Sequence, residues 1–182
     1  MAISNHERVG KALDMLRAGL GPFVDRELQA AAKDGSISPQ ALRGFLDDPM
    51  LGNKTPAEWD AAALLKLMWD VWNDVFRKIL GHAERSLVSE LREVRNKWAH
   101  QQAFSSDDAD RALDSTERIL TAVSAPQADE VRKIKMELRR LVFDEQVRAE
   151  KRKSSGGAIE SQAATAITPW RDVVTPHRDV AS

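Results

Sequence analysis

The chain has 182 residues, of which 42% are hydrophobic and 30% are charged, and its formal net charge at pH 7 is −1. This balance is typical of a globular domain rather than of a disordered or membrane-embedded chain, and the net charge provides no overall basic field for nucleic acid. The absence of cysteine excludes disulfides, thiolate metal sites and cysteine nucleophiles.

Apolar residues recur at helical spacing along most of the chain, and no stretch alternates in the manner of a strand. The pattern predicts a first helix over residues 5–18 and a second helical stretch from Pro22 to about Lys33. The segment KDGSISPQ predicts a turn followed by a short helix through Leu46, and the breaker-rich LDDPMLGNKT predicts a loop.

The clearest helix start is TPAEW, in which Thr55 caps, Pro56 occupies the first helical position and Glu58 completes a capping box. From here we expect one helix to about Leu80. Its apolar residues are too many for the buried face of an ordinary surface helix; they are Leu64, Leu65, Met68, Trp69, Val71, Trp72, Val75, Phe76 and Ile79. Such a helix is either central in a bundle or partly a subunit interface.

Three further helices follow. The first starts near His82 and has a core stripe that ends at Trp98, and the second follows the turn AFSSDDAD, capped by Ser105 or Ser106. SAPQADE ends the second helix, and the last helix becomes densely charged in RKIKMELRRLVFDEQVRAEKRK. Because acids are interleaved with these cations, we interpret this stretch as a solvated helix rather than a nucleic-acid footprint.

The sequence thus predicts an all-α helical bundle over residues 1–153. From Ser154 the composition changes to Ser, Gly, Ala and Thr without an amphipathic pattern. We therefore expect residues 154–182 to be a flexible tail, or a linker to a following domain.

The segment LVSELREVRNKWAHQQ places Arg95, Asn96 and His100 beside Trp98. A spacing of five residues turns a side chain by about 140° on a regular helix, so Arg95 and His100 do not share a face. They converge only if the helix frays or bends after Trp98, or if a second subunit completes the site. One interpretation is structural, with an arginine stem along the core edge and a histidine at a helix C-terminus.

The other interpretation is chemical. Histidine acts as a general base near neutral pH, and arginine is a permanent cation whose fork fits a phosphate. With Asn96 to orient either group, His100 and Arg95 suit metal-independent cleavage of an RNA phosphodiester, which leaves a 2′,3′-cyclic phosphate.

Other classes of site have little support. The remaining histidines are scattered, with no metal-ligand spacing, and no glycine-rich loop is present to cradle a phosphate, so we expect neither a metal nor a cofactor. No stretch is apolar enough to span a membrane, and no secretory signal is visible at the N-terminus. We expect a cytoplasmic protein.

The segment REVRNKWAH resembles the signature of the HEPN superfamily, in which an arginine precedes a histidine by a few positions. RNKWAHQQ with the following DDADRALDSTERIL resembles the branch named after the Swt nuclear-surveillance endonuclease. The resemblance extends from about Pro56 to Val147. It implies a HEPN-type bundle that forms a homodimer, with Arg95 and His100 of both subunits at one cleft, and RNA as the substrate.

The chain departs from many nuclease members of that superfamily, which carry further polar residues directly after the histidine. Here Gln101, Gln102 and Ala103 follow, and the chain has no tyrosine. Members that have lost cleavage serve as binding or dimerisation modules, so a non-catalytic interaction module is the alternative. The segment TPWRDVVTPHRDV resembles the lead-in to the ATPase region of large bacterial phage-defence proteins. This implies a ribonuclease or RNA-sensing part of an anti-phage ATPase.

Overall fold

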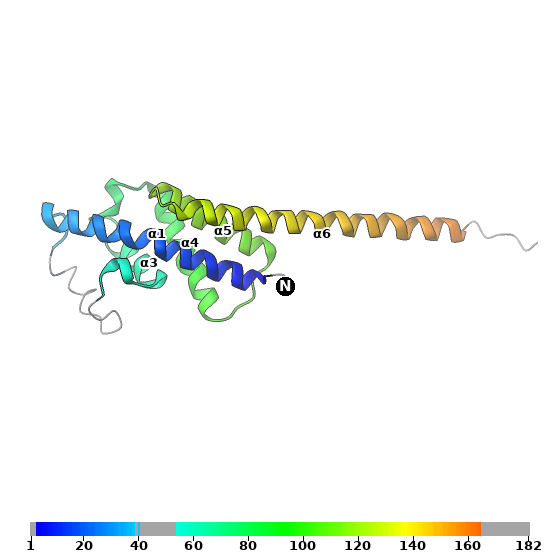
Figure 1. The fold of residues 1–182 in the computed structure, drawn as a ribbon, viewed down its shortest axis with the longest axis horizontal. Coiled ribbons are helices and arrows are strands. Elements are labelled where there is room, and N and C mark those ends of the chain that lie inside the picture. The colour runs from blue at the N-terminus through cyan, green and yellow to red at the C-terminus, as the bar shows by residue number, and fades with distance from the viewer. Residues whose placement is uncertain (1–2, 39, 41–53, 165–182) are drawn as a thin grey trace, which may run out of the picture. The chain divides into compact units, whose positions relative to one another are not determined.

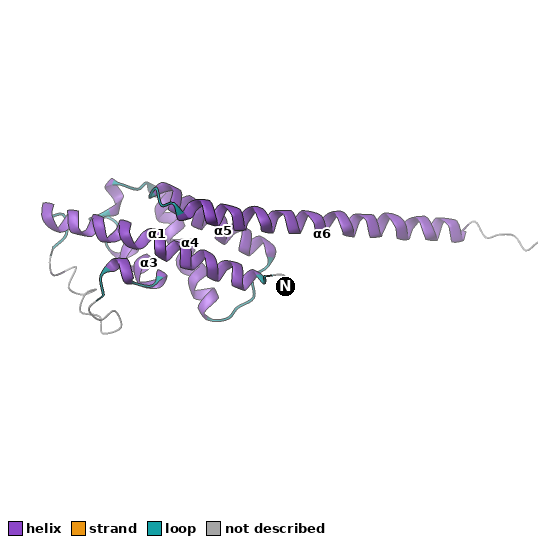
Figure 2. Ribbon diagram, in the orientation of Figure 1, coloured by secondary structure: helices purple, strands orange, loops and turns teal. Residues whose placement is uncertain are grey.

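The computed structural model describes residues 3–38, 40 and 54–164. These residues are helical almost throughout and contain no strand, which confirms the predicted all-α fold (Figures 1 and 2). The described residues up to Arg140 form one compact unit that holds the core, and those from Leu141 onwards belong to a second unit. Most of the short helix predicted through Leu46 and most of the loop after it lie outside the described residues, as do residues 165–182.

Helix α1 (Asn5–Asp34) is continuous, so the predicted division at Pro22 is wrong. Gly19 and Gly21 are buried inside this helix, where their lack of a side chain lets neighbouring residues approach closely. A side-chain carbon added at Gly21 would lie 2.8 Å from the carbonyl oxygen of Ala57, and one at Gly19 would collide with Leu120. Close packing against these neighbours therefore overrides the low helix propensity of this stretch.

The segment after Thr55 is broken where one long helix was predicted. Glu58 accepts hydrogen bonds from the backbone N–H and the hydroxyl of Thr55, as expected, but the box begins only the 3₁₀ turn η1 (Pro56–Glu58). Asp60 then caps a separate helix, α3 (Ala61–Asp70), by accepting from the N–H of Ala63. Turns and the 3₁₀ turn η2 (Phe76–Lys78) follow. The second cap, at Asp60, is the local cause of the break.

The broad apolar surface of this segment is covered within the chain. Trp72 and Phe76 are 2% and 0% exposed, and the Phe76 ring lies 6.0 Å from Phe23 of α1 and 6.2 Å from Trp72, centroid to centroid. Of the predicted residues, Ile79 is exposed, at 49%, and Trp69 is half-buried. The alternative that placed a subunit interface on this surface therefore has no support. Dimerisation stays a prediction, which rests on the resemblance to HEPN domains and no longer on this surface.

The next two helices match their predicted positions. Helix α4 (His82–Ala99) starts at the expected residue, and α5 (Ser106–Ala122) is capped by Ser105, whose hydroxyl accepts from the N–H of Asp108. Helix α1 packs against α3, α4 and α5. The first unit is thus a bundle around α1.

Helix α6 (Gln127–Ala164) crosses the predicted boundary at residue 153 without a break. Residues 154–164 of the predicted tail therefore continue the helix. Apart from Gly156 and Gly157, this stretch contains no strong helix breaker, and its Ala, Glu and Gln residues favour continuation. The mobility expected of the tail stays a prediction. None of the helices in the described part of the chain has the length and apolarity to span a membrane.

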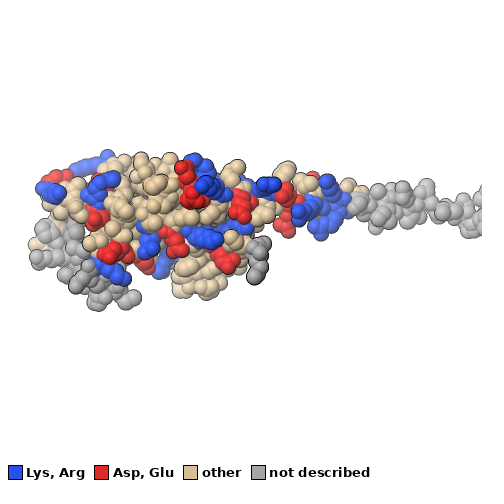
Figure 3. Space-filling view, viewed as in Figure 1, with Lys and Arg blue, Asp and Glu red and all other residues tan. Residues whose placement is uncertain are grey.

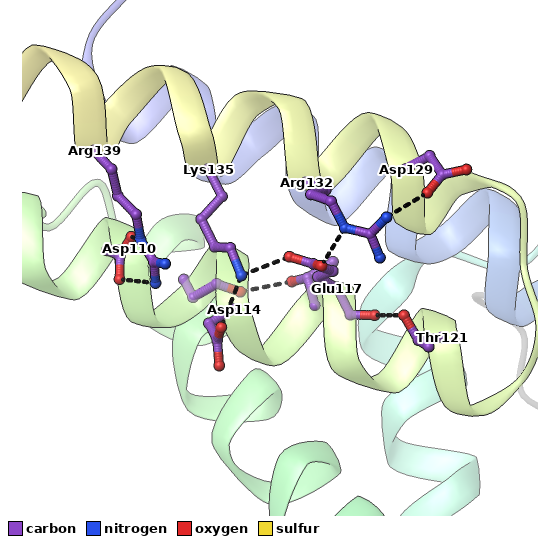
Figure 4. Close-up of polar contacts among 10 residues, drawn as sticks. Asp110, Asp114, Glu117, Thr121, Asp129, Arg132, Lys135 and Arg139 are labelled. Carbon is purple, nitrogen blue, oxygen red and sulfur yellow. Dashed lines mark hydrogen bonds and ion pairs between the residues drawn. The ribbon is translucent and has the colours of Figure 1, made fainter.

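An ion-pair row joins α5 to α6 (Figure 4). Its contacts are Arg139 to Asp110 at 2.6 and 2.9 Å, Lys135 to Asp114 at 2.9 Å, Lys135 to Glu117 at 2.6 Å, and Arg132 to Glu117 at 2.8 Å. Lys135 is only 8% exposed, so the interpretation of this stretch as a solvated helix is wrong at Lys135, whereas Arg132 and Arg139 are exposed as expected. On the face shown in Figure 3, basic and acidic side chains are interspersed.

The row holds its members in their charged forms. Burial alone would raise the pKa of Glu117, but hydrogen bonds from Lys135 and Arg132 outweigh burial and hold that pKa below its ordinary value. The pKa of Asp114 is lowered, chiefly by its hydrogen bond from Lys135. Burial likewise opposes the charge on Lys135, yet its two carboxylate partners raise its pKa.

We expect Lys135→Met to lower the free energy of unfolding at neutral pH by about 1–3 kcal/mol, because Asp114 and Glu117 lose a charged donor. Both carboxyls have folded pKa values below their unfolded ones, so the stabilisation is present at neutral pH and is lost as the pH falls through the folded values. Urea unfolding of both proteins at neutral pH and at about pH 3 should show this difference shrinking.

The matched control is Lys133→Met. Lys133 lies on the same helix and pairs with Glu130, but both side chains are largely exposed. Screening by water makes its expected loss much smaller and nearly independent of pH. Equal losses for the two variants at every pH would contradict the ascribed role of the Lys135 contacts.

Candidate functional site

The predicted motif occupies the C-terminal end of α4, where His100 is the C-cap. The backbone N–H of His100 donates to the carbonyl of Asn96 at 3.0 Å, so helical hydrogen bonding continues up to the histidine. The helix neither frays nor bends after Trp98. Regular geometry therefore keeps Arg95 and His100 about 140° apart, while Asn96, four residues before His100, lies on the side of the histidine.

A left-handed residue ends the helix directly after the histidine. Gln101 has φ 55°, its N–H donates to the carbonyl of Trp98 at 3.0 Å, and the N–H of Gln102 donates to the carbonyl of Lys97 at 3.1 Å. These two bonds form a Schellman motif with Gln101 where glycine is usual. The turn leaves the side chain of His100 exposed at the very end of α4.

We expect Gln101→Gly to raise the free energy of unfolding by about 1 kcal/mol, because glycine adopts the left-handed conformation without the clash that an L side chain makes. Thermal or urea unfolding measures the change. Gln102→Gly is the control and should not stabilise, because Gln102 has no positive φ. A loss of stability in Gln101→Gly would contradict this account of the helix end.

Among the residues that the structure describes, Arg95 has one long polar contact. Its Nη2 lies 3.5 Å from Oδ2 of Asp60, the N-cap of α3, and about a third of its side chain is exposed. An ion pair this long between partly exposed groups is weak. A phosphate group can therefore compete with Asp60 for the guanidinium. Nothing in the sequence indicated Asp60 as a partner of the motif.

The N-terminal turn of α1 supports the same end of α4. His6 Nε2 lies 3.1 Å from the carbonyl oxygen of Trp98, and the His6 ring stacks on the Trp98 ring at 5.6 Å between centroids. Asn5 donates to the carbonyl of Phe104, beyond the turn. A hollow of about 330 Å³ lies between α1 and Trp98. His6, which the sequence showed only as an isolated histidine, is thus a neighbour of the motif.

Lys97, the cation between Asn96 and Trp98, has partners outside α4, whereas the indole N–H of Trp98 is buried without an acceptor among the described residues. Lys97 pairs with Asp108 of α5 at 2.8 Å and lies over the Phe104 ring, so it braces the turn. Across the described ranges, no three His, Asp or Glu side chains are grouped as a metal ion would require. The structure places Asn96 and His100 on one side of α4 and Arg95 on another, and in a single chain it does not bring all three together.

Comparison with family models identifies the class. The helical bundle with this motif on α4 is a HEPN-type domain: residues 11–124, more than half of the chain, match the family described as Swt1-like HEPN. The chain therefore belongs to the Swt1-like HEPN family. The match runs from α1 to the end of α5, so it begins before and ends before the resemblance noted from Pro56 to Val147. No curated protein and no solved structure matches the chain.

Proposed function

We propose that the chain is a metal-independent endoribonuclease domain with Arg95, Asn96 and His100 in its site. The observation that carries the proposal is the exposed His100 at the end of α4, with Asn96 one turn before it on the same side. His100 takes the proton of the RNA 2′-hydroxyl, whose oxygen attacks the adjacent phosphorus. Arg95 stabilises the charge that develops on the phosphate, and the 5′-oxygen leaves with a proton from water, to which His100 afterwards returns its own.

The site we propose is shared by two copies of the chain. Regular helical geometry directs Arg95 and His100 of one copy about 140° apart, and the helix end is fixed by its hydrogen bonds. In a two-fold homodimer whose α4 helices meet, His100 of one copy faces Arg95 of the other across one cleft. This arrangement is the remaining way to bring both groups to one phosphate.

We propose anti-phage defence as the wider role, with the domain attached to or associated with an ATPase as its ribonuclease or RNA-sensing part. Family membership and the segment TPWRDVVTPHRDV, which lies outside the described residues, support this role. A non-catalytic dimerisation module is the second candidate. The contact between Arg95 and Asp60 favours it, because it gives the arginine a structural partner.

Incubation of the purified protein with total RNA tests the proposal. We expect fragments that end in 2′,3′-cyclic phosphate, because the substrate's own hydroxyl is the nucleophile. DNA lacks that hydroxyl and should survive, and a chelator should not change the rate. Cleavage that requires magnesium would contradict the mechanism, and an intact dimer without cleavage would favour the interaction module.

A further inference from the structure

Two arginines of α4 lie over one tryptophan of α3. The guanidinium carbons of Arg85 and Arg92 are 4.9 and 5.4 Å from the centroid of the Trp69 ring. Within residues 3–38, 40 and 54–164, neither guanidinium has a hydrogen-bond acceptor or a carboxylate partner, and Nε of Arg85 is buried without an acceptor. Contact with the ring holds two cations in place and leaves their N–H groups, other than the buried Nε–H of Arg85, available to a ligand.

These arginines lie on the stripe of α4 that ends at the proposed site. At 100° per residue, five side chains fall within about 80° of one another around the helix. They are Arg85, Ser89, Arg92, Asn96 and His100. The stripe is about 22 Å long, which is the length of a few nucleotides of a single strand.

A hollow of about 600 Å³ adjoins the Arg85 end of the stripe. Trp69, Arg85 and Ser89 line it, together with Glu90 and Glu93. Glu90 is neutralised by Arg111 at 2.6 Å, which leaves Glu93 as the flanking acid. The surface therefore offers guanidinium and hydroxyl donors beside an aromatic ring, and these groups suit the phosphate, sugar and base of RNA.

We propose that this stripe is a binding track for single-stranded RNA, in which Arg85 and Arg92 contact backbone phosphates upstream or downstream of the bond cleaved at His100. The proposal rests on the proposed ribonuclease function, since that function supplies the RNA at one end of the stripe. Continuity with Asn96 and His100, and guanidinium planes on which bases can stack, favour RNA over an acidic protein segment.

Binding of a short fluorescein-labelled single-stranded RNA to the full chain, measured by anisotropy in a His100→Ala background, tests the track. Arg85→Ala/Arg92→Ala should weaken binding at least about tenfold and reduce the slope of log affinity against log salt by about 1.4, because two phosphate contacts are lost. The matched control is Arg26→Ala/Arg118→Ala, which removes the same charge elsewhere. Arg26 lies over the Phe23 ring at 5.4 Å, and Arg118 is exposed on α5.

Trp69 provides an independent signal. RNA should change the tryptophan fluorescence of the chain, and Trp69→Phe, which keeps an aromatic ring for the arginines, should remove most of that change. Equal weakening by the control pair, or no RNA binding, would overturn the track. Tighter binding of an oligoglutamate peptide through the same arginines would also overturn it, in favour of a protein partner.

The assay separates the track from catalysis. Arginine-dependent binding by a chain that never cleaves RNA would support the track while the ribonuclease proposal fails. Cleavage by the wild-type chain, combined with unchanged binding in Arg85→Ala/Arg92→Ala, would refute the track and leave the ribonuclease proposal in place.

Discussion

His100→Ala should abolish RNA cleavage, with a loss of about 10²–10⁴-fold in rate at saturating RNA, because the proposed general base is removed. The fold should be unaffected, since the side chain is exposed at the helix end and contributes little to the core. Arg95→Ala should also abolish cleavage, but with some loss of stability, because its stem is partly buried and its contact with Asp60 disappears. Gel analysis of RNA products and urea unfolding measure the two effects separately.

His82→Ala is the matched control for the histidine. His82 is exposed at the opposite end of the same helix, in the lining of the hollow beside Trp69, so its loss can change RNA affinity but should leave the rate at saturating RNA unchanged. Cleavage that persists in His100→Ala, or that falls equally in His82→Ala, would contradict the assignment of His100 as the base.

Phe76→Ala should lower the free energy of unfolding by about 3–5 kcal/mol, because it removes a fully buried ring and leaves a cavity. The ring is 0% exposed and packs between Phe23 and Trp72 within one chain. Ile79→Ala alters the same predicted apolar surface at a residue that is 49% exposed, and should cost less than about 1 kcal/mol. Urea unfolding of the three proteins provides the comparison.

These losses should not vary with protein concentration, because the cover of this surface comes from the chain itself. A subunit interface would behave differently, since dissociation would link the apparent stability to concentration. A large loss in the free energy of unfolding of Ile79→Ala that increases on dilution would instead indicate a subunit interface on this surface.

The parts of the fold that could be predicted from the sequence are those set by local chemistry. The start of α4 and the serine cap of α5 follow from residues within one turn. The start near His82 was predicted correctly, and of the two predicted capping residues, Ser105 and Ser106, the structure has Ser105. The continuity of α1 through Gly19 and Gly21 depends on neighbours far along the chain, so the sequence pattern predicted a division before Pro22 that the structure does not have. The break after Glu58 is indicated in the sequence by Asp60, which is a good N-cap residue. The long apolar pattern on both sides of it nevertheless favoured a single helix.

The spacing of charges in the sequence is consistent with the ion-pair row between α5 and α6. The acids of α5 follow the spacing four then three, and the cations of α6 follow three then four; these residues are Asp110, Asp114, Glu117, Arg132, Lys135 and Arg139. Such mirrored spacing on helices joined by a short turn predicts antiparallel pairing, with each charge opposite its partner. The interleaved acids of α6 by themselves do not indicate this pairing.

In the candidate site, too, local features could be predicted from the sequence and long-range contacts could not. Arg95, Asn96 and His100 came from a contiguous motif, and the angular separation of Arg95 from His100 came from helix geometry. The contacts of Asp60, His6 and Trp69 with α4 join residues far apart in the sequence, and no pattern in one sequence indicates such pairs. These long-range contacts are what the structure adds to the motif.

Mixing two inactive variants tests the shared site most directly. One variant is Arg95→Ala, which keeps His100, and the other is His100→Ala, which keeps Arg95. The two proteins are purified separately, mixed and allowed to exchange subunits before RNA is added. A heterodimer of the two retains one site with an intact arginine from one copy and an intact histidine from the other. The mixture should therefore recover up to about a quarter of the wild-type activity, since half of the dimers are mixed and each keeps one of two sites. A mixture that exchanges subunits but stays inactive would contradict a site built from both copies.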